Sequence, residues 1–178
     1  LYVKQELVLN ANGEIVDGIA FDVDLQKELK KDKNLQLLPL FISEVDEKKQ
    51  YIIPLRGKGL WGPIWGFIAL EDDLNKVFGA VFDHKGETAG LGAEITQQWF
   101  QNRFVGEKIF DTKGKLVGIN VSKTNNDPKD LDKNDHEVDA ISGATITGDG
   151  VTEMITERLQ HYIPYLNTTA ITLALNYN

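Results

Sequence analysis

The segment that most constrains the fold is an amphipathic stretch that follows a run of very small residues. From residue 151 onward, apolar residues recur on one face at helical spacing: Val151, Met154, Ile155, Leu159 and Tyr162. The run before it, residues 139–148, combines hydroxyl side chains with glycines. Thr145 or Thr147 is a candidate N-cap, so we expect a helix to begin here and to end near Pro164.

A helix start beside small residues suits the binding of a phosphate group. The first backbone N–H groups of a helix have no partners within it, and they lie at the positive end of the helix dipole. We expect residues 146–151 to supply these groups, while Gly143 and Ala144 leave the approach to the backbone open. A capped loop without any ligand explains the same pattern, because caps of this kind are common.

The small-residue run contains a tetrad that resembles the flavinylation motif, Ser/Thr-Gly-Ala-Thr, of the FMN-binding domain family. The tetrad consists of Ser142, Gly143, Ala144 and Thr145. In that family the last threonine of the motif carries FMN through a phosphoester bond. Asp139, three residues before the tetrad, also fits the family pattern. The resemblance therefore implies a covalent FMN cofactor attached at Thr145.

A glycine-rich segment, residues 57–62, matches the G-x-G-x-x-G pattern of dinucleotide-binding loops. Such a loop requires a helix directly after it, whereas here Pro63 and a strand-like run follow, so we reject a dinucleotide site. Trp61 and Trp65 beside these glycines suit a flat wall for an aromatic ligand. Packing of both tryptophans in the core is the competing interpretation.

A second loop, residues 87–92, resembles the Glu-Thr-Pro-Gly-Leu-Gly segment of the same family, with Ala89 in place of the usual proline. Read without the family, the loop is an ordinary turn between a strand and a helix. With it, we expect four side chains to border the flavin ring and one glycine to give it room: Trp61, Glu87, Thr88, Leu91 and Gly92. Lys123, which follows a strand, is a further candidate for positive charge near the phosphate or the ring.

The resemblance implies an α+β fold, with a twisted, largely antiparallel sheet and flanking helices. We expect a single FMN-binding domain over residues 1–178. Strands are predicted at residues 3–9, 37–45, 50–55, 75–83, 108–111, 115–121 and 169–175. Pro39 predicts that residues 37–45 form an edge strand, and the last strand is also expected at an edge. A short helix is predicted at residues 96–104, with Trp99, Phe100 and Phe104 pointing inward.

Composition excludes several classes of site and partner. The chain has no cysteine, so it has no disulfide, thiolate metal site or cysteine nucleophile. Its net charge of −8 argues against nucleic-acid binding, which needs a basic face, and against adsorption on an anionic membrane. Its 3 histidines are far apart and lack metal-ligand spacing, so we expect no metal site.

The functional expectation comes from the resemblance. The Gly-x-Gly-Leu-Trp run at residues 57–61 is most like one branch of the family, the C subunits of bacterial sodium-translocating NADH:quinone oxidoreductases. This implies an electron-transfer flavoprotein subunit without complete activity alone. Its implied partners are the other subunits and a separate flavin transferase. The implied location is the periplasmic side of the inner membrane, with an anchor before Leu1.

Two alternatives stay open from the sequence. One is the equivalent FMN subunit of the related ferredoxin-linked electron-transport complex, which has the same cofactor chemistry. The other is an extracytoplasmic interaction domain whose motif has lost its cofactor. The presence or absence of bound flavin separates the second alternative from the first.

Overall fold

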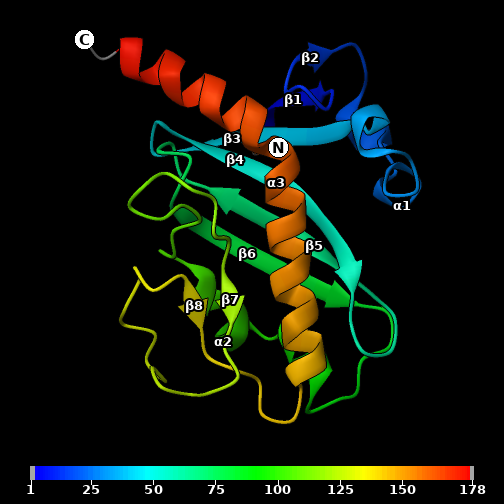
Figure 1. The fold of residues 1–178 in the computed structure, drawn as a ribbon, viewed down its shortest axis with the longest axis vertical. Helices are drawn as coiled ribbons and strands as arrows, with labels where there is room; N and C mark the ends of the chain where they lie inside the picture. The colour runs from blue at the N-terminus through cyan, green and yellow to red at the C-terminus, as the bar shows by residue number, and fades with distance from the viewer. Residues whose placement is uncertain (1–2, 177–178) are drawn as a thin grey trace.

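The computed structural model describes residues 3–176, with side chains to residue 173, and shows a sheet crossed on one face by a long helix (Figure 1). The sheet has six strands in the order β2-β1-β3-β4-β5-β6, and all neighbouring strands are antiparallel. The strands are β1 (Val3–Leu9), β2 (Ile15–Val16), β3 (Leu38–Val45), β4 (Lys48–Lys58), β5 (Pro63–Leu70) and β6 (Val77–His84). The predicted α+β fold with a largely antiparallel sheet is confirmed.

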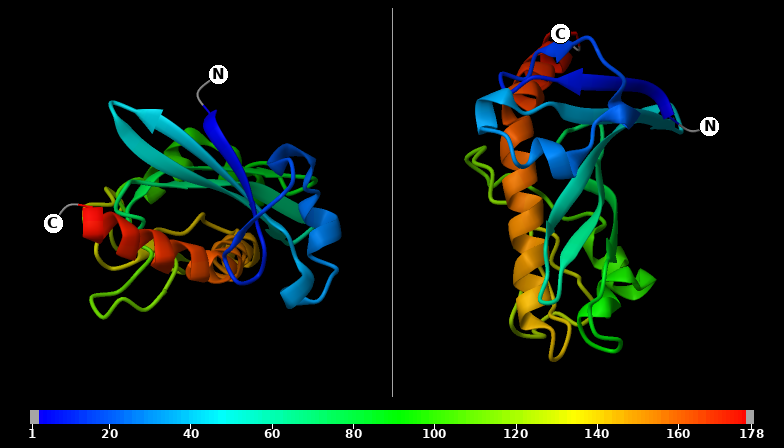
Figure 2. Two further views of the ribbon diagram at one scale, coloured as in Figure 1. Left: turned by 90° about the horizontal axis from the view of Figure 1, so that it is seen from above. Right: turned by 90° about the vertical axis from the view of Figure 1, so that its right-hand side faces the viewer.

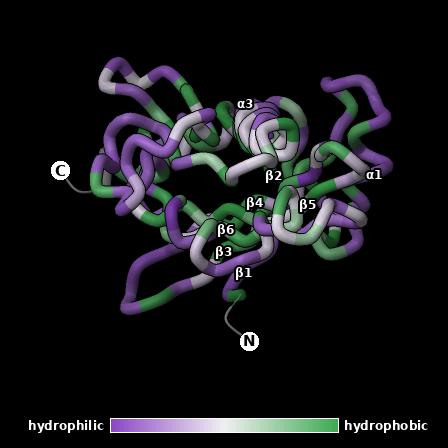
Figure 3. Tube along the Cα trace, turned by 90° about the horizontal axis from the view of Figure 1, so that it is seen from below, coloured by the Kyte–Doolittle hydropathy of each residue, from purple (hydrophilic) through white to green (hydrophobic). Residues whose placement is uncertain are grey.

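The core lies between the sheet and the long helix α3 (Thr145–Asn176). Because successive side chains of a strand point to opposite faces, Tyr51, Ile53 and Leu55 of β4 all belong to this core. The apolar face of α3 predicted from the sequence is buried against them, as Ile155 and Leu159 show. Figure 2 shows α3 along one face of the sheet, and Figure 3 shows hydrophobic residues gathered on the strands beneath it.

The opposite face of the sheet is covered in part by the segment between β2 and β3. This segment contains the short helices η1 (Ala20–Asp22), α1 (Leu25–Glu28) and η2 (Lys33–Leu35). Val8, Ala20 and Phe41 form a small second cluster here, and the rings of Phe21 and Phe41 are 4.5 Å apart. The charged residues between positions 22 and 34 therefore lie in a layer at the surface of the molecule.

The C-terminal helix is longer than predicted. Pro164 lies inside α3, and the residues predicted as the last edge strand, 169–175, are helical. A proline removes one helical hydrogen bond, but contacts on either side of it hold the helix in place. Tyr162 donates its hydroxyl hydrogen to the Pro39 carbonyl at 2.7 Å, and Leu166 is buried in the core. Tertiary packing on both sides of Pro164 therefore keeps the helix continuous across the proline.

The strand at residues 37–45 was predicted at an edge, and this prediction is wrong. β3 lies between β1 and β4. Pro39 is opposite Val8 of β1, while pairing with β4 begins only at Phe41. The proline therefore interrupts no ladder with β4, which removes the reason to place it at an edge.

Beyond β6 the chain is less regular than the sequence predicts. Residues 108–111 and 115–121 form two isolated bridges, Lys76 with Lys108 and Phe110 with Leu116, followed by the short strand β7. β7 (Asn120–Val121) pairs in parallel with β8 (Glu137–Val138).

Residues 92–104 form η3 (Gly92–Thr96), α2 (Gln98–Gln101) and η4 (Asn102–Phe104). Phe100 and Phe104 are buried as expected, but Trp99 is exposed and has the Arg103 guanidinium over its ring at 5.0 Å.

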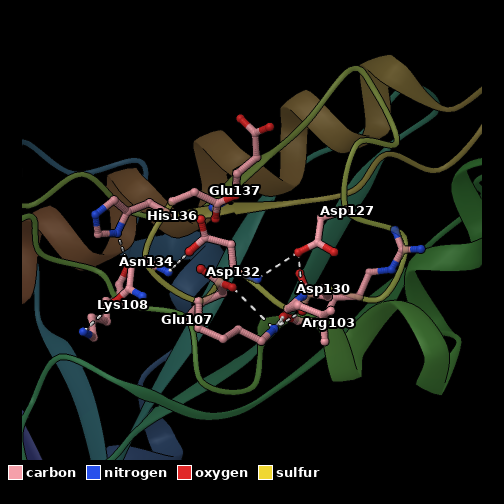
Figure 4. A network of polar contacts seen from close by, with 12 residues as sticks. Arg103, Glu107, Lys108, Asp127, Asp130, Asp132, Asn134, His136 and Glu137 are labelled. Carbon is pink, nitrogen blue, oxygen red and sulfur yellow. Dashed lines mark hydrogen bonds and ion pairs between the residues drawn. The ribbon is translucent and has the colours of Figure 1, made fainter.

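The long loop between β7 and β8 is fastened by a polar network around Glu107 (Figure 4). Lys133 Nζ lies 3.4 Å from the buried Glu107 Oε1, donates to the Arg103 carbonyl at 2.8 Å and pairs with Asp130. Arg103 Nη1 in turn donates to the Asp139 carbonyl at 2.8 Å. The network therefore fixes the chain directly upstream of the small-residue tetrad.

Burial raises the pKa of Glu107 to about 7, and the nearby Lys133 ammonium only partly opposes this effect. Asp135 and Asp132 raise the pKa further. Within residues 3–176 neither carboxylate oxygen of Glu107 accepts a hydrogen bond. Ionisation of Glu107 is therefore less favourable in the folded protein than in the unfolded chain.

This shift predicts how stability depends on pH. A carboxyl group with a raised folded-state pKa stabilises the fold below its unfolded pKa, and this contribution is lost as pH rises through about 7. Glu107→Gln, which stays neutral, should therefore raise the unfolding temperature relative to wild type at about pH 8, with the gain shrinking toward about pH 4. Glu153→Gln, at an exposed position, is the control and should show no such trend. A difference from wild type that is constant across this range would contradict the assignment.

Candidate functional site

Three segments that are far apart in sequence meet at the carboxylate of Glu87. Trp61 N–H, in the turn between β4 and β5, donates to Oε1 at 2.8 Å. The hydroxyl of Thr147, in the first turn of α3, donates to Oε2 at 2.6 Å. Glu87 itself is only 7% exposed, and its backbone N–H donates to His84 Nδ1 at 3.0 Å. One buried side chain therefore joins the glycine-rich turn, the loop after β6 and the start of the long helix.

Glycines leave the space that this carboxylate occupies. A Cβ atom added to Gly92 would lie 2.4 Å from Glu87 Oε2 and 2.5 Å from Thr147 Oγ1. A Cβ added to Gly59 would lie 2.6 Å from Glu87 Oε1. These separations are shorter than a normal contact, so a side chain at either position would displace the Glu87 carboxylate. The space at Gly92, which we expected to admit the flavin ring, is filled in this structure by the Glu87–Thr147 pair.

The start of α3 differs in detail from the predicted one. The helix begins at Thr145, and the carbonyl of Ala144 accepts the first helical hydrogen bond, from Gly148 N–H at 2.9 Å. The cap is therefore Ala144, and neither threonine fills that position. Because Gly148 is already paired, the N–H groups without a helical partner belong to residues 145–147, not to residues 146–151.

The two threonines of this turn have different surroundings. Thr147 is 1% exposed, and its hydroxyl is committed to Glu87. Thr145 is exposed, and its hydroxyl makes no hydrogen bond to any part of the chain that the structure describes. Of these two hydroxyl groups, only that of Thr145 is therefore placed to react with a group approaching from solvent.

The tetrad before the helix requires small residues for the fold itself. Gly143 has φ +73°, a left-handed conformation that glycine adopts without strain. A Cβ added to it would lie 2.8 Å from Leu91 Cδ2, so the tetrad touches the loop that carries Glu87. Ala144 is buried in the main core, whereas Ser142 is exposed. Free access to the backbone is therefore not the only reason for small residues here.

The remaining predicted site residues lie on the surface of the same region. Trp61 is 67% exposed and Leu91 is 40% exposed, and Thr88 is also exposed. Lys123 Nζ lies 3.7 Å from Asp149 Oδ2, in the second turn of α3. The exposed Trp61 ring is not packed in the core, which rules out the core interpretation for this tryptophan.

The side chains around the site do not form a metal centre. Among residues 3–176 there is no group of three or more histidine, aspartate or glutamate side chains placed to hold a metal ion. No helix in the described part of the chain combines the length and apolar character needed to cross a membrane.

The packing around Glu87 predicts a sharp difference between two glycines of one loop. Gly92→Ala should push the Glu87 carboxylate away from Thr147 and destabilise the fold by about 1–3 kcal/mol. Gly86→Ala, where an added Cβ meets nothing within 4 Å, should change stability by no more than about 0.5 kcal/mol. Urea unfolding of the two variants measures both values. Equal stabilities would show that the space at Gly92 is not needed.

The same region of the chain is similar to known proteins. The FMN-binding domain family matches residues 59–160, more than half of the chain. The C subunit of the Na(+)-translocating NADH-quinone reductase from Neisseria meningitidis is 42% identical over 120 residues, which cover 66% of this chain and 44% of that protein. The equivalent protein of Vibrio vulnificus is 33% identical over 167 residues, covering 84% of this chain and 64% of its own length. The chain thus spans about half to two thirds of these relatives.

Solved structures extend the likeness to the fold. The crystal structure of the C subunit of the Na(+)-translocating NADH-quinone reductase from Parabacteroides distasonis superimposes with a TM-score of 0.81 at 41% identity, covering 92% of this chain and 78% of that one. The structure of Shewanella oneidensis NqrC gives a TM-score of 0.72 at 28% identity, with coverages of 92% and 84%. The chain therefore belongs to the FMN-binding domain family, and it is similar to the C subunits of the Na(+)-translocating NADH-quinone reductases.

Proposed function

We propose that this chain is an electron-transfer flavoprotein subunit that carries FMN on Thr145 through a phosphoester bond. The observation that carries the proposal is the contrast between the two threonines at the start of α3. Thr145 is exposed, whereas Thr147 is buried and bonded to Glu87. The tetrad and the family membership support FMN as the cofactor, and the geometry favours the Thr145 hydroxyl as its attachment point.

The surroundings of Thr145 fit a bound phosphate. The backbone N–H groups of residues 145–147 have no carbonyl four residues earlier within the helix, so they can donate to phosphate oxygens. The helix dipole adds about 0.3–1 kcal/mol when the site is exposed. Lys123, whose ammonium lies 3.7 Å from Asp149 Oδ2, is the candidate cation near this turn. The phosphoester therefore replaces solvent at groups that are already oriented toward an anion.

The flavin ring, in this proposal, lies against the exposed side chains of the three joined segments: Trp61, Thr88, Leu91 and Ser142. Trp61 and Leu91 supply apolar contact area, and the hydroxyl groups supply polar contacts. Glu87 has both oxygens engaged by the protein, so it orients Trp61 and Thr147 and need not contact the ring. The flavin supplies the redox chemistry, while the chain binds and orients it.

The chain, in this proposal, works within a membrane-bound, sodium-translocating NADH:quinone oxidoreductase. The names of its relatives support this placement, because they are subunits of such a reductase. The G-x-G-x-x-G match at residues 57–62 forms the β4–β5 turn, where Gly59 N–H donates to the Gly62 carbonyl at 2.8 Å, and no helix follows. Oxidation of NADH is therefore assigned to other subunits, and a separate flavin transferase attaches the FMN on the periplasmic side.

The attachment site has a direct test. Co-expression with a flavin transferase should add the mass of one FMN less one water to the wild-type chain. Thr145→Ala should lose the adduct, because the esterified hydroxyl is gone. Thr147→Ser is the matched control: it keeps a hydroxyl for Glu87, and so it should keep the adduct. Intact-mass spectrometry and in-gel flavin fluorescence measure both.

Two results would contradict the assignment. The adduct would persist in Thr145→Ala if another hydroxyl carried the FMN. A wild-type chain that folds but stays colourless in the presence of the transferase would instead favour the interaction domain without a cofactor.

A further inference from the structure

Arg158, in the middle of α3, is a buried cation that has no counter-ion among the residues that the structure describes. Its side chain is only 2% exposed. Within residues 3–176 its guanidinium makes one hydrogen bond, a long one of 3.4 Å from Nη2 to Gln36 Oε1, and Nη1 is buried without a partner. It forms no salt bridge with any described carboxylate. Burying an unpaired charge is strongly unfavourable, so this arrangement calls for an anion.

Arg158 lines a cavity of about 380 Å³ that is rich in positive charge. The other charged and polar residues of the lining are Lys31, Lys33, Gln36, Glu157, Gln160 and His161. Lys31 is partly neutralised by Glu28 at 2.7 Å, and Glu157 is the one acidic residue of the lining. Burial lowers the pKa of His161, Arg158 and Lys33 lower it further, and Glu157 opposes them.

This cavity is separate from the proposed flavin site. Arg158 is 13 positions after Thr145 on the same helix, a separation of about 20 Å along its axis. The cavity lies between this part of α3 and the segment after α1, whose Leu29, Lys31 and Lys33 form its other wall. A ligand bound here would therefore not touch the tetrad.

We propose that this cavity binds a small dianion of the phosphomonoester class, with Arg158 as the anchoring charge. The planar guanidinium presents paired N–H donors that match phosphate oxygens. Lys33 is exposed at the rim and adds a flexible ammonium. The three cations face two carboxylates, Glu157 and the Glu28 that pairs with Lys31, which leaves a net positive charge for a phosphomonoester, an anion near neutral pH. The long bond to Gln36 is weak and is readily exchanged for a ligand oxygen.

The test compares phosphate binding by wild type and Arg158→Met at constant ionic strength, with chloride as the replaced ion. Inorganic phosphate and glycerol phosphate should raise the wild-type unfolding temperature saturably, by about 5–10 °C when the ligand exceeds its Kd about a hundredfold. Arg158→Met fills similar volume without the buried charge. Without phosphate it should therefore be at least as stable as wild type, and it should not respond to phosphate.

A second variant keeps the test independent of the buried position. Lys33→Gln, at the exposed rim, should leave the phosphate-free unfolding temperature unchanged and weaken phosphate binding by about two- to fivefold. Lys113→Gln, an exposed lysine outside the cavity, should leave binding unchanged. Equal weakening by both variants would indicate general charge attraction and would overturn the cavity assignment.

Vesicle binding distinguishes the two possible sources of the phosphomonoester, a lipid headgroup and a free metabolite. Co-sedimentation of wild type, but not Arg158→Met, with phosphatidylcholine vesicles that contain phosphatidic acid would identify a lipid headgroup. Stabilisation by soluble glycerol phosphate without such co-sedimentation would identify a free metabolite. Absence of stabilisation by either form overturns the proposal. An equal response of wild type and Arg158→Met also overturns it, because the phosphate would then bind without Arg158.

Discussion

The hydrogen bonds of Glu87 fix the relative positions of the three segments on which the proposed function depends. A buried carboxylate is tolerated when its oxygens are satisfied, and here Trp61 N–H and the Thr147 hydroxyl satisfy one oxygen each. Gly59 and Gly92 make room for the carboxylate, since a Cβ at either would collide with it. The exposed Thr145 therefore occupies a defined place relative to Trp61 and Leu91.

Helix α3 links this site to the rest of the molecule. Its apolar face forms one side of the main core, so the position of its first turn is set by the packing of the helix from Val151 to Leu166. The bond from Tyr162 to Pro39 fastens the distal half to the sheet. The same helix carries Arg158, so a ligand in the cavity that Arg158 lines and a phosphoester at Thr145 would both contact one rigid element.

The sequence predicts those features that depend on local patterns. Strand alternation identified β1, β4 and β6, and helical spacing identified the buried face of α3, because periodicity reports which side faces the core. The Glu87–Thr147 bond joins residues 60 positions apart and has no local signal. Arg158 resembles a solvent-facing helical residue until its packing is seen. Pro164 ended the predicted helix, because a local rule cannot include the contacts of Tyr162 and Leu166 with the core.

A double-mutant cycle between Glu87 and Thr147 tests the central claim most directly. The free energies of unfolding of Glu87→Ala, Thr147→Val and the double variant give the coupling energy between the two side chains. A buried hydrogen bond to a charged group predicts that the double variant is less destabilised than the sum of the single variants, by about 1.5–3 kcal/mol. Additive effects within about 0.3–0.5 kcal/mol would contradict the account, because the two segments would then not be joined through Glu87.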